Sequence, residues 1–164
     1  MQPSIMKSAR LNGLIMGLLF SINFLLSISK ITVLMVFSYF VMSLILVGIY
    51  RMAIRFRDVE NAGVITFGRV YSFIVLTFFF AALISSAVKY IYFQFINPQY
   101  LETLLQESMK VMEALKFPFD KANMEQMQDI MKPATFSLQY IWMNVILGSI
   151  VGLVMAPFIS KKAV

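Results

Sequence analysis

Hydrophobic residues fill four long stretches of the chain that contain no charged residue. A helix rises about 1.5 Å per residue, so ~20 such residues cross the ~30 Å hydrocarbon core of a bilayer. The uncharged stretches are residues 11–29, 31–50, 70–88 and 133–160. The pattern therefore predicts an all-α integral membrane protein with four transmembrane helices, whose spans are placed at about residues 9–29, 31–50, 69–96 and 133–160. Lys30 alone separates the first two runs, which predicts a tight turn and an antiparallel helical hairpin.

Charged residues are distributed unevenly between the two ends of the predicted spans. Six acids and four lysines fall in residues 97–132, whereas the other flanks are basic: Lys7, Arg10, Arg51, Arg55, Arg57, Arg69, Lys161 and Lys162. The positive-inside rule then places both termini and the loop from 51 to 69 in the cytoplasm, and residues 97–132 outside. The net charge of +6 is thus a signal of topology, and no nucleic-acid partner is expected.

Composition agrees with this interpretation. The chain is 60% hydrophobic and 13% charged, against roughly 45–50% and 25% in soluble domains.

Lys89 ends the third apolar stretch and raises the question of a charge inside the membrane. If Arg69 marks the inner interface, 20 residues carry the helix ~30 Å, to Lys89. The same length counted back from Lys161 ends near Ile141, between Tyr140 and Trp142. We therefore expect Lys89 at the outer interface, with its stem reaching toward water and aromatic residues forming a belt beside it. The alternatives are an intramembrane functional charge and a contact with an anionic head group or a partner.

Residues 97–132 predict a helical extracytoplasmic cap between spans three and four. Asn97 and Pro98 fit the N-cap and first position of an amphipathic helix that reaches Lys116, and its apolar residues are Leu101, Leu104, Leu105, Met109, Met112 and Leu115. Pro118 interrupts the pattern, and Asp120 is expected to cap a second helix, with Phe119 and Met124 as a hydrophobic staple. The apolar faces can be covered by the span ends, by lipid, by a second copy or by another protein.

Two groups of residues are candidates for contacts with other molecules. The first, at the outer end, would touch a protein partner or a lipid head group: Lys89, Tyr92, Asn97, Tyr100, Met109 and Met112. The second, Arg51, Arg55 and Arg57, is interleaved with apolar residues and is expected to touch anionic lipid heads.

The residues present give little support for a catalytic site or a metal site. Histidine and cysteine are both absent, which removes imidazole bases, thiolate nucleophiles and the usual zinc ligands. Methionines of the cap could suit Cu(I), and its acids could suggest acid–base pairs. Without His or Cys, and with lysines at helical spacing from the acids, we predict no metal, no cofactor and no enzymatic activity.

Small and polar residues inside the predicted spans suggest how the helices pack. Gly13 and Gly17 are four residues apart, as are Gly148 and Gly152, a spacing that lets helices approach closely. Buried amides at Asn12, Asn23 and Asn144 are expected to form hydrogen bonds between helices.

Three segments carry a family resemblance: "YIYFQFINPQYLE", the preceding "VITFG" and the closing "GSIVGLVMAPFISKK". Together they resemble the Bacteroidota membrane family catalogued as domain of unknown function 4199, over essentially the whole chain. The resemblance implies the four-span fold and a multi-pass location in the bacterial cytoplasmic (inner) membrane, with no assigned activity. Members of that family look frequently encoded near a membrane-associated glycosyltransferase, which suits an accessory role in glycolipid or envelope assembly.

Two functions remain open at this point. The leading hypothesis is a non-enzymatic accessory or scaffold subunit whose partners are membrane lipids and either another protein or further copies of itself. The alternative is a transporter of a small solute or lipid that acts as an oligomer, since four helices alone leave little room for a path.

Overall fold

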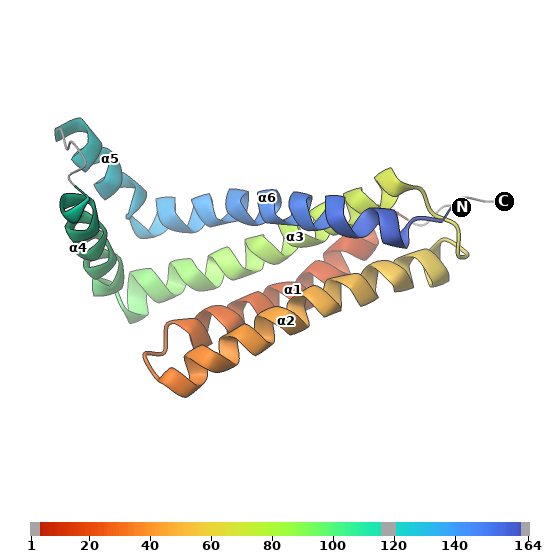
Figure 1. Ribbon diagram of the computed structural model, residues 1–164, viewed down its shortest axis with the longest axis horizontal. Helices are drawn as coiled ribbons and strands as arrows, with labels where there is room; N and C mark the ends of the chain where they lie inside the picture. Colours follow the sequence, from red (N-terminus) through yellow and green to blue (C-terminus); the bar gives the residue numbers. More distant parts are fainter. Residues whose placement is uncertain (1–3, 116–120, 162–164) are drawn as a thin grey trace. The chain divides into compact units, whose positions relative to one another are not determined.

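The computed structural model describes residues 4–115 and 121–161. In this part of the chain the backbone forms six α-helices and two π-helical segments (Figure 1): α1 (Ile5–Ser27), α2 (Thr32–Arg55), η1 (Phe56–Glu60), α3 (Phe67–Ile91), η2 (Tyr92–Ile96), α4 (Gln99–Ala114), α5 (Lys121–Ile130) and α6 (Pro133–Ile159). Four helical segments are long and apolar enough to cross a membrane, namely α1, α2 with η1, α3 with η2, and α6. The predicted all-α class with four spanning helices is confirmed.

The chain divides into two compact units. The first, called here the bundle unit, contains Met1–Ser85 and Ile141–Val164, and the second, the cap unit, is Ser86–Tyr140. Helices α3 and α6 each begin in one unit and end in the other.

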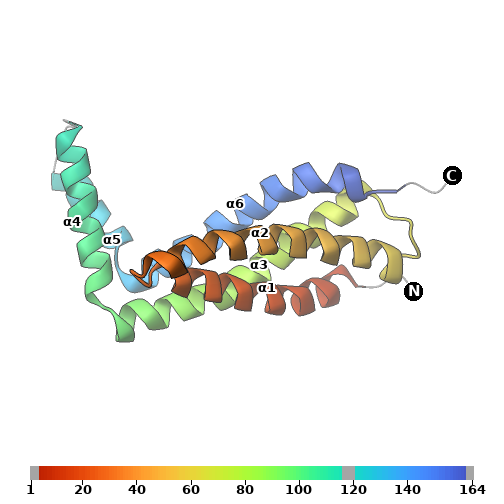
Figure 2. The same cartoon turned by 60° about the horizontal axis from the view of Figure 1, so that its bottom comes forward.

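Helices α1 and α2 form the predicted hairpin, and they lie side by side and antiparallel in both views (Figures 1 and 2). Lys30 lies in the turn with φ = 57°, a left-handed conformation that lets the chain reverse within a few residues. Helix α2 continues past Tyr50, the end predicted from the apolar run, because the arginines that follow are good helix formers and Gly63 is the first glycine after them. The chain turns at Ala62 and Gly63, which both have positive φ.

Helix α3 is the most enclosed of the four spanning helices. Half of its most apolar window, 50%, is buried, against 33% for α1 and 22% for α2 and for α6. Glycines on both neighbours explain this enclosure. A Cβ added at Gly13 of α1 would lie 2.5 Å from the Phe80 Cβ, and one added at Gly148 of α6 would lie 2.6 Å from the Phe78 Cβ. The two predicted glycine pairs are therefore sites of close helix approach, and both face α3.

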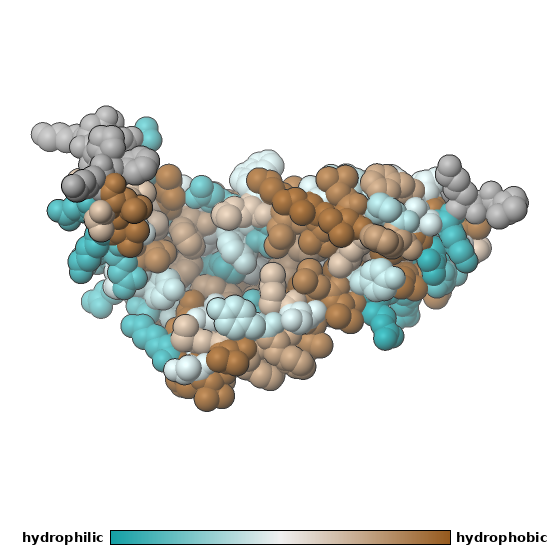
Figure 3. Space-filling view, viewed as in Figure 1, coloured by the Kyte–Doolittle hydropathy of each residue, from teal (hydrophilic) through white to brown (hydrophobic). Residues whose placement is uncertain are grey.

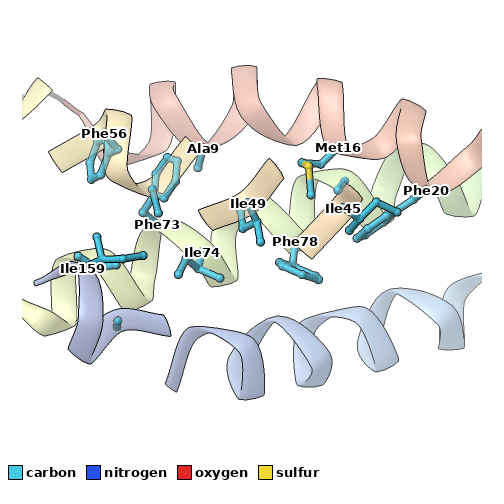
Figure 4. Close-up of a cluster of buried hydrophobic side chains, with 14 of the residues drawn as sticks. Ala9, Met16, Phe20, Ile45, Ile49, Phe56, Phe73, Ile74, Phe78 and Ile159 are labelled. Carbon is cyan, nitrogen blue, oxygen red and sulfur yellow. The ribbon is translucent and has the colours of Figure 1, made fainter. Parts of the chain in front are cut away.

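The bundle core gathers side chains from all four helices (Figure 4). Near the chain termini Phe56 stacks on Phe73, with ring centroids 4.4 Å apart. Further along, Met16, Ile49 and Phe78 are almost fully buried. Outward-facing apolar side chains cover the opposite surface of α6, including Ile146, Ile150, Val154 and Phe158, and hydrophobic side chains gather over this helix in Figure 3.

Not every amide inside the spans acts as predicted. Asn12 donates from Nδ2 to the Ser8 carbonyl of its own helix, 2.8 Å away, so the expected bond between helices is wrong for this residue. The carbonyl four residues back on the same helix lies within reach of a short polar side chain, and the Asn12 amide uses it. Asn144 is buried on α6.

Inside the cap unit, the corner between η2 and α4 differs from the predicted one. Helix α4 starts at Gln99, Pro98 occupies the position before it, and no side chain caps the helix. Asn97 instead donates from Nδ2 to the Tyr92 hydroxyl at 3.4 Å, because the π-helical turn of η2 places that phenol above it. The predicted N-cap role of Asn97 is wrong. The predictions for Lys116, Pro118, Phe119 and Asp120 fall outside the described residues.

Candidate functional site

Within the cap unit, α3 and α6 meet along a short polar seam. The Ser86 hydroxyl of α3 donates to the Ser137 carbonyl of α6, and the Lys89 Nζ lies 3.7 Å from the centroid of the Tyr140 ring. Ser86 and Lys89 are three residues apart, as are Ser137 and Tyr140, so each pair lies on one helix face. We call these four residues the Lys89 seam.

Lys89 lies against α6 but points in an unexpected direction. The two counts along the sequence put Lys89 and Ile141 at one level, and in the structure Lys89 contacts Tyr140, the residue before Ile141. The side chain is only 3% exposed, however, so the expectation of a stem reaching toward water is wrong. Because α3 is enclosed, its polar side chains meet protein, and the ring face of Tyr140 receives the ammonium.

Ser137 contributes a buried hydroxyl to the same seam. The residue is 3% exposed, and no described residue hydrogen-bonds to its Oγ. Its carbonyl already accepts the Ser86 hydroxyl. A buried hydroxyl without a partner costs about 1–3 kcal/mol, so this Oγ is a place where a bound polar molecule would stabilise the protein.

An aromatic cluster follows the seam along the chain. Phe93, the buried residue of η2, stacks on Tyr100 with centroids 5.6 Å apart and meets Phe136 edge-on at 5.4 Å. Tyr92 lies edge-on to both Phe93 and Tyr100. The wide turn of η2 turns these rings toward the start of α4, so three predicted contact residues, Tyr92, Asn97 and Tyr100, come together here.

Burial makes the Tyr100 phenol a weaker acid. Its pKa is raised above the usual value, mainly by burial and further by Tyr92 and Glu107 nearby. The hydroxyl therefore stays protonated at neutral pH and is available as a donor.

Met109 and Met112 belong to a different part of the cap unit. They lie nine and twelve residues after Tyr100 on α4, about 14 and 18 Å along the helix, and both side chains are half-buried. The predicted outer contact residues therefore form two groups, one around the aromatic cluster and one further along α4.

The three arginines predicted to touch anionic lipid heads do not share one environment. Arg51 and Arg55 are exposed, as a lipid contact requires. Arg57 instead donates from Nη1 to the Ile159 carbonyl at 3.1 Å and from Nε to Asp58 at 2.6 Å. Cations are favoured at the carboxyl end of a helix, and Arg57 is held by the end of α6; its contact with lipid stays a prediction.

Sequence reasoning missed two partners in the Lys89 seam. Ser86 and Ser137 were not singled out, although Ser86 precedes Lys89 by three residues and so lies on the same helix face. Among the described residues there is also no group of three or more acidic side chains that could hold a metal ion.

Comparison with known protein families identifies a match over most of the chain. A family model described as "Protein of unknown function (DUF4199)" matches residues 11–161. No curated protein matches the chain, and neither does any solved structure.

Proposed function

The chain belongs to the family of proteins of unknown function DUF4199, and from its geometry we propose a non-enzymatic accessory or scaffold subunit of the bacterial cytoplasmic membrane. In this proposal the protein acts through contacts, and it docks a protein partner that works in envelope or glycolipid assembly. Both termini lie in the cytoplasm, and the cap unit carries the docking surface outside the membrane.

The observation that carries the proposal is the surface of α4. Its apolar stripe starts at the buried Leu101 and runs along the helix, but Val111 and Leu115 are 59% and 69% exposed. Met112, between them, is half-buried. An amphipathic helix with an open apolar stripe is a common way for one protein to be recognised by another.

Acidic residues border this stripe. Glu102, Glu107 and Glu113 are all exposed on α4, and Lys110 is the only basic residue of that helix. A partner with basic residues around an apolar groove would match both the stripe and its border.

Site-specific photocross-linking in native membranes tests the docking surface. A photoreactive side chain at Met112 is expected to give a defined adduct with a partner, whereas the same group at Lys110, on the opposite face of α4, is not. A Val111→Glu substitution should abolish the Met112 adduct, because it places a charge in the apolar contact. Equal labelling from both positions, or none from either, would contradict docking through the stripe.

The topology can be tested separately, and the chain suits the test because it contains no cysteine. In spheroplasts, a membrane-impermeant thiol reagent is expected to label Ala114→Cys directly and Val64→Cys only after permeabilisation. The reverse order would overturn the assigned orientation, and it would do so whatever the cross-linking result.

A second candidate function, transport by an oligomer, is favoured by the polar residues buried along α3. Thr77, Ser85, Ser86 and Lys89 are all buried on this helix, and polar side chains at membrane depth commonly mark solute pathways. Flux through proteoliposomes that is lost in Lys89→Ala or in Asn144→Ala would support transport. The absence of flux for a broad panel of solutes would eliminate it.

A further inference from the structure

Two exposed arginines of the α1–α2 hairpin lie far from the level at which α3 begins and α6 ends. We propose that Arg10 and Arg51 bind the head groups of anionic phospholipids about 12 Å nearer the middle of the bundle than Arg69, so that the boundary between hydrocarbon and head groups is stepped around the protein. The orientation proposed above makes this the cytoplasmic leaflet, and the inference takes nothing else from the proposed function.

The first step of the argument is the level of Arg10, which the packing of Gly13 fixes. A Cβ added at Gly13 would lie 2.5 Å from the Phe80 Cβ and 3.1 Å from the Thr77 carbonyl oxygen, and α1 and α3 run in the same direction in both views (Figures 1 and 2). Arg10 precedes Gly13 by three residues, so it is level with Thr77, and its guanidinium lies 5.7 Å from the centroid of the Phe80 ring. Thr77 follows Arg69 by eight residues, about 12 Å of helix.

The second step is an independent count along α2. Phe56 stacks on Phe73, and α2 runs antiparallel to α3 (Figure 1). Arg51 precedes Phe56 by five residues, so it is level with Phe78, nine residues or about 14 Å beyond Arg69. The two arginines therefore agree on one level, although they are placed by different contacts.

The third step is the surface of α6 between this level and the end of the helix. A Cβ added at Gly148 would lie 2.6 Å from the Phe78 Cβ, so α6 continues past the level of the two arginines for another eleven residues, to Ile159. Lys161, just beyond, pairs with Ile65 through the backbone. Four large apolar side chains on this part of α6 are 55–76% exposed: Ile150, Leu153, Val154 and Phe158. Such a surface suits hydrocarbon rather than water.

A flat boundary does not suit both surfaces. At the level of Arg69 it would place two exposed guanidinium groups about 12 Å inside hydrocarbon, where a charge is costly. At the level of Arg10 it would leave the exposed face of α6 in water. A boundary that follows the two arginines along the hairpin and Lys161 along α6 satisfies both surfaces.

A lean of the bundle explains only part of this step. Across two interaxial distances of about 9 Å, from the hairpin over α3 to α6, an average lean of ~20° supplies about 6 Å. Head groups must be drawn inward by about as much again. A guanidinium suits that task, because it can bind a phosphate through two parallel hydrogen bonds.

Depth measurements test the step, because the chain contains no cysteine. Nitroxide labels are attached at Leu11→Cys, beside Arg10, and at Val154→Cys, two positions that are 60% and 61% exposed. The full-length protein is reconstituted in vesicles of phosphatidylcholine and phosphatidylglycerol, and collisions of each label with oxygen and with a water-soluble nickel chelate give its depth. Val154 lies six residues past Gly148, so a flat boundary at Arg69 would make Leu11 the deeper position by about 9 Å. We expect the opposite order, with Val154 deeper than Leu11.

A second arm tests whether head groups bind beside Arg10. Trp142 is the single tryptophan of the chain, so Leu11→Trp in a Trp142→Phe background reports on the lipid at this position when brominated phosphatidylglycerol or brominated phosphatidylcholine is added. We expect the anionic lipid to be preferred, and Arg10→Met to lower its relative affinity about fivefold, the effect of one basic residue near an anionic surface. Arg10→Lys should retain most of the preference, and Lys110→Met, an exposed lysine of α4, should leave it unchanged.

Two results would overturn the proposal. One is a Leu11 label that lies deeper than the Val154 label, or a Val154 label that meets the nickel chelate as freely as a residue in water. The other is a preference for phosphatidylglycerol that is the same with and without Arg10. All the substituted side chains are exposed, and circular dichroism shows whether the helices of each variant are intact. The outcome of cross-linking at Met112 does not affect these measurements, so the two proposals fail separately.

Discussion

Gly13→Ala is expected to force α1 away from α3, because the added methyl group has no room. Its Cβ would lie 2.5 Å from the Phe80 Cβ and 3.1 Å from the Thr77 carbonyl oxygen. Neither atom can rotate away, because the Phe80 Cβ is bonded directly to the backbone of α3 and the Thr77 carbonyl oxygen belongs to that backbone. Relief therefore requires movement of a helix rather than of a side chain.

The size of that movement follows from the contact distance. Ordinary van der Waals contact begins at 3.4 Å, so the helices must separate by about 0.9 Å, the difference between 3.4 and 2.5 Å. Overpacking of this kind costs about 1–3 kcal/mol. A gap of 0.5–1 Å also forfeits roughly a quarter to a half of the dispersion energy of the atoms that face it. In lipid this packing energy is a main source of helix association.

The higher helix propensity of alanine stabilises the same variant, so its effect must be measured separately. Replacing glycine by alanine in a helix gains about 1 kcal/mol, and Gly68→Ala measures that gain alone because nothing lies within 4 Å of its added Cβ. The difference between Gly13→Ala and Gly68→Ala is therefore the packing cost, about 2 kcal/mol. Unfolding in mixed micelles of dodecyl maltoside and sodium dodecyl sulfate, followed by circular dichroism, measures it.

The displacement itself can be measured in the same variants. Ile22 on α1 and Leu83 on α3 are exposed, and the chain has no native cysteine. Spin labels attached at Ile22→Cys and Leu83→Cys should therefore move apart by about 1 Å on average in the Gly13→Ala variant. Adding Gly17→Ala should cost little more, because its Cβ would lie 2.8 Å from the Ile84 Cβ and the same separation relieves both clashes. The close-approach reasoning is refuted if Gly13→Ala and Gly68→Ala have equal stability and the label distance does not change.

Three further predictions concern other parts of the chain. Phe93→Ala should remove about 3–5 kcal/mol of local packing energy, so hydrogen exchange of the α4 amides should become faster. Phe95 is exposed on the same turn, and Phe95→Ala should leave that exchange unchanged. Equal exchange rates in the two variants would count against the aromatic cluster. Lys30→Gly should raise the free energy of unfolding by about 1 kcal/mol, because glycine adopts φ = 57° without strain, and a loss of stability would contradict the assigned turn. Arg57→Met should speed hydrogen exchange at the last turn of α6, whereas Arg55→Met should not, and similar exchange in both would show that the guanidinium does not hold that end.

The sequence predicted the helices and their register well because charge and apolar length are one-dimensional signals. Counts from Arg69 and from Lys161 placed Lys89 level with Ile141, and Lys89 contacts the preceding residue, Tyr140. Close helix approach at the glycine pairs could also be predicted, since a four-residue spacing puts both members of a pair on one helix face. What these signals predict is depth and spacing along each helix.

The direction in which each side chain points around its helix axis was harder to predict. Burial of Lys89 depends on α6 covering that side of α3, which the length of an apolar run does not reveal. The predicted N-cap role of Asn97 failed for a related reason, because the π-helical turn of η2 alters which way its neighbours point. The hydrogen bond from Arg57 to the Ile159 carbonyl was not predicted either. Such turns leave no mark in the hydrophobic pattern.

The two glycine contacts on α3 also have a consequence for biogenesis. Helix α1 is synthesised before α3, so Gly13 and Gly17 are already in the bilayer when Phe80 arrives. Gly148 and Gly152 belong to α6, which leaves the ribosome only after α4 and α5. During that interval Phe78 already packs on Phe20 of α1, but the side of Phe78 that later meets Gly148 lacks its partner helix and must face lipid or the insertion machinery. A nascent chain that stalls before α6 therefore displays a bulky aromatic flank in the membrane, a feature by which quality-control proteases could distinguish an unfinished molecule from a finished one.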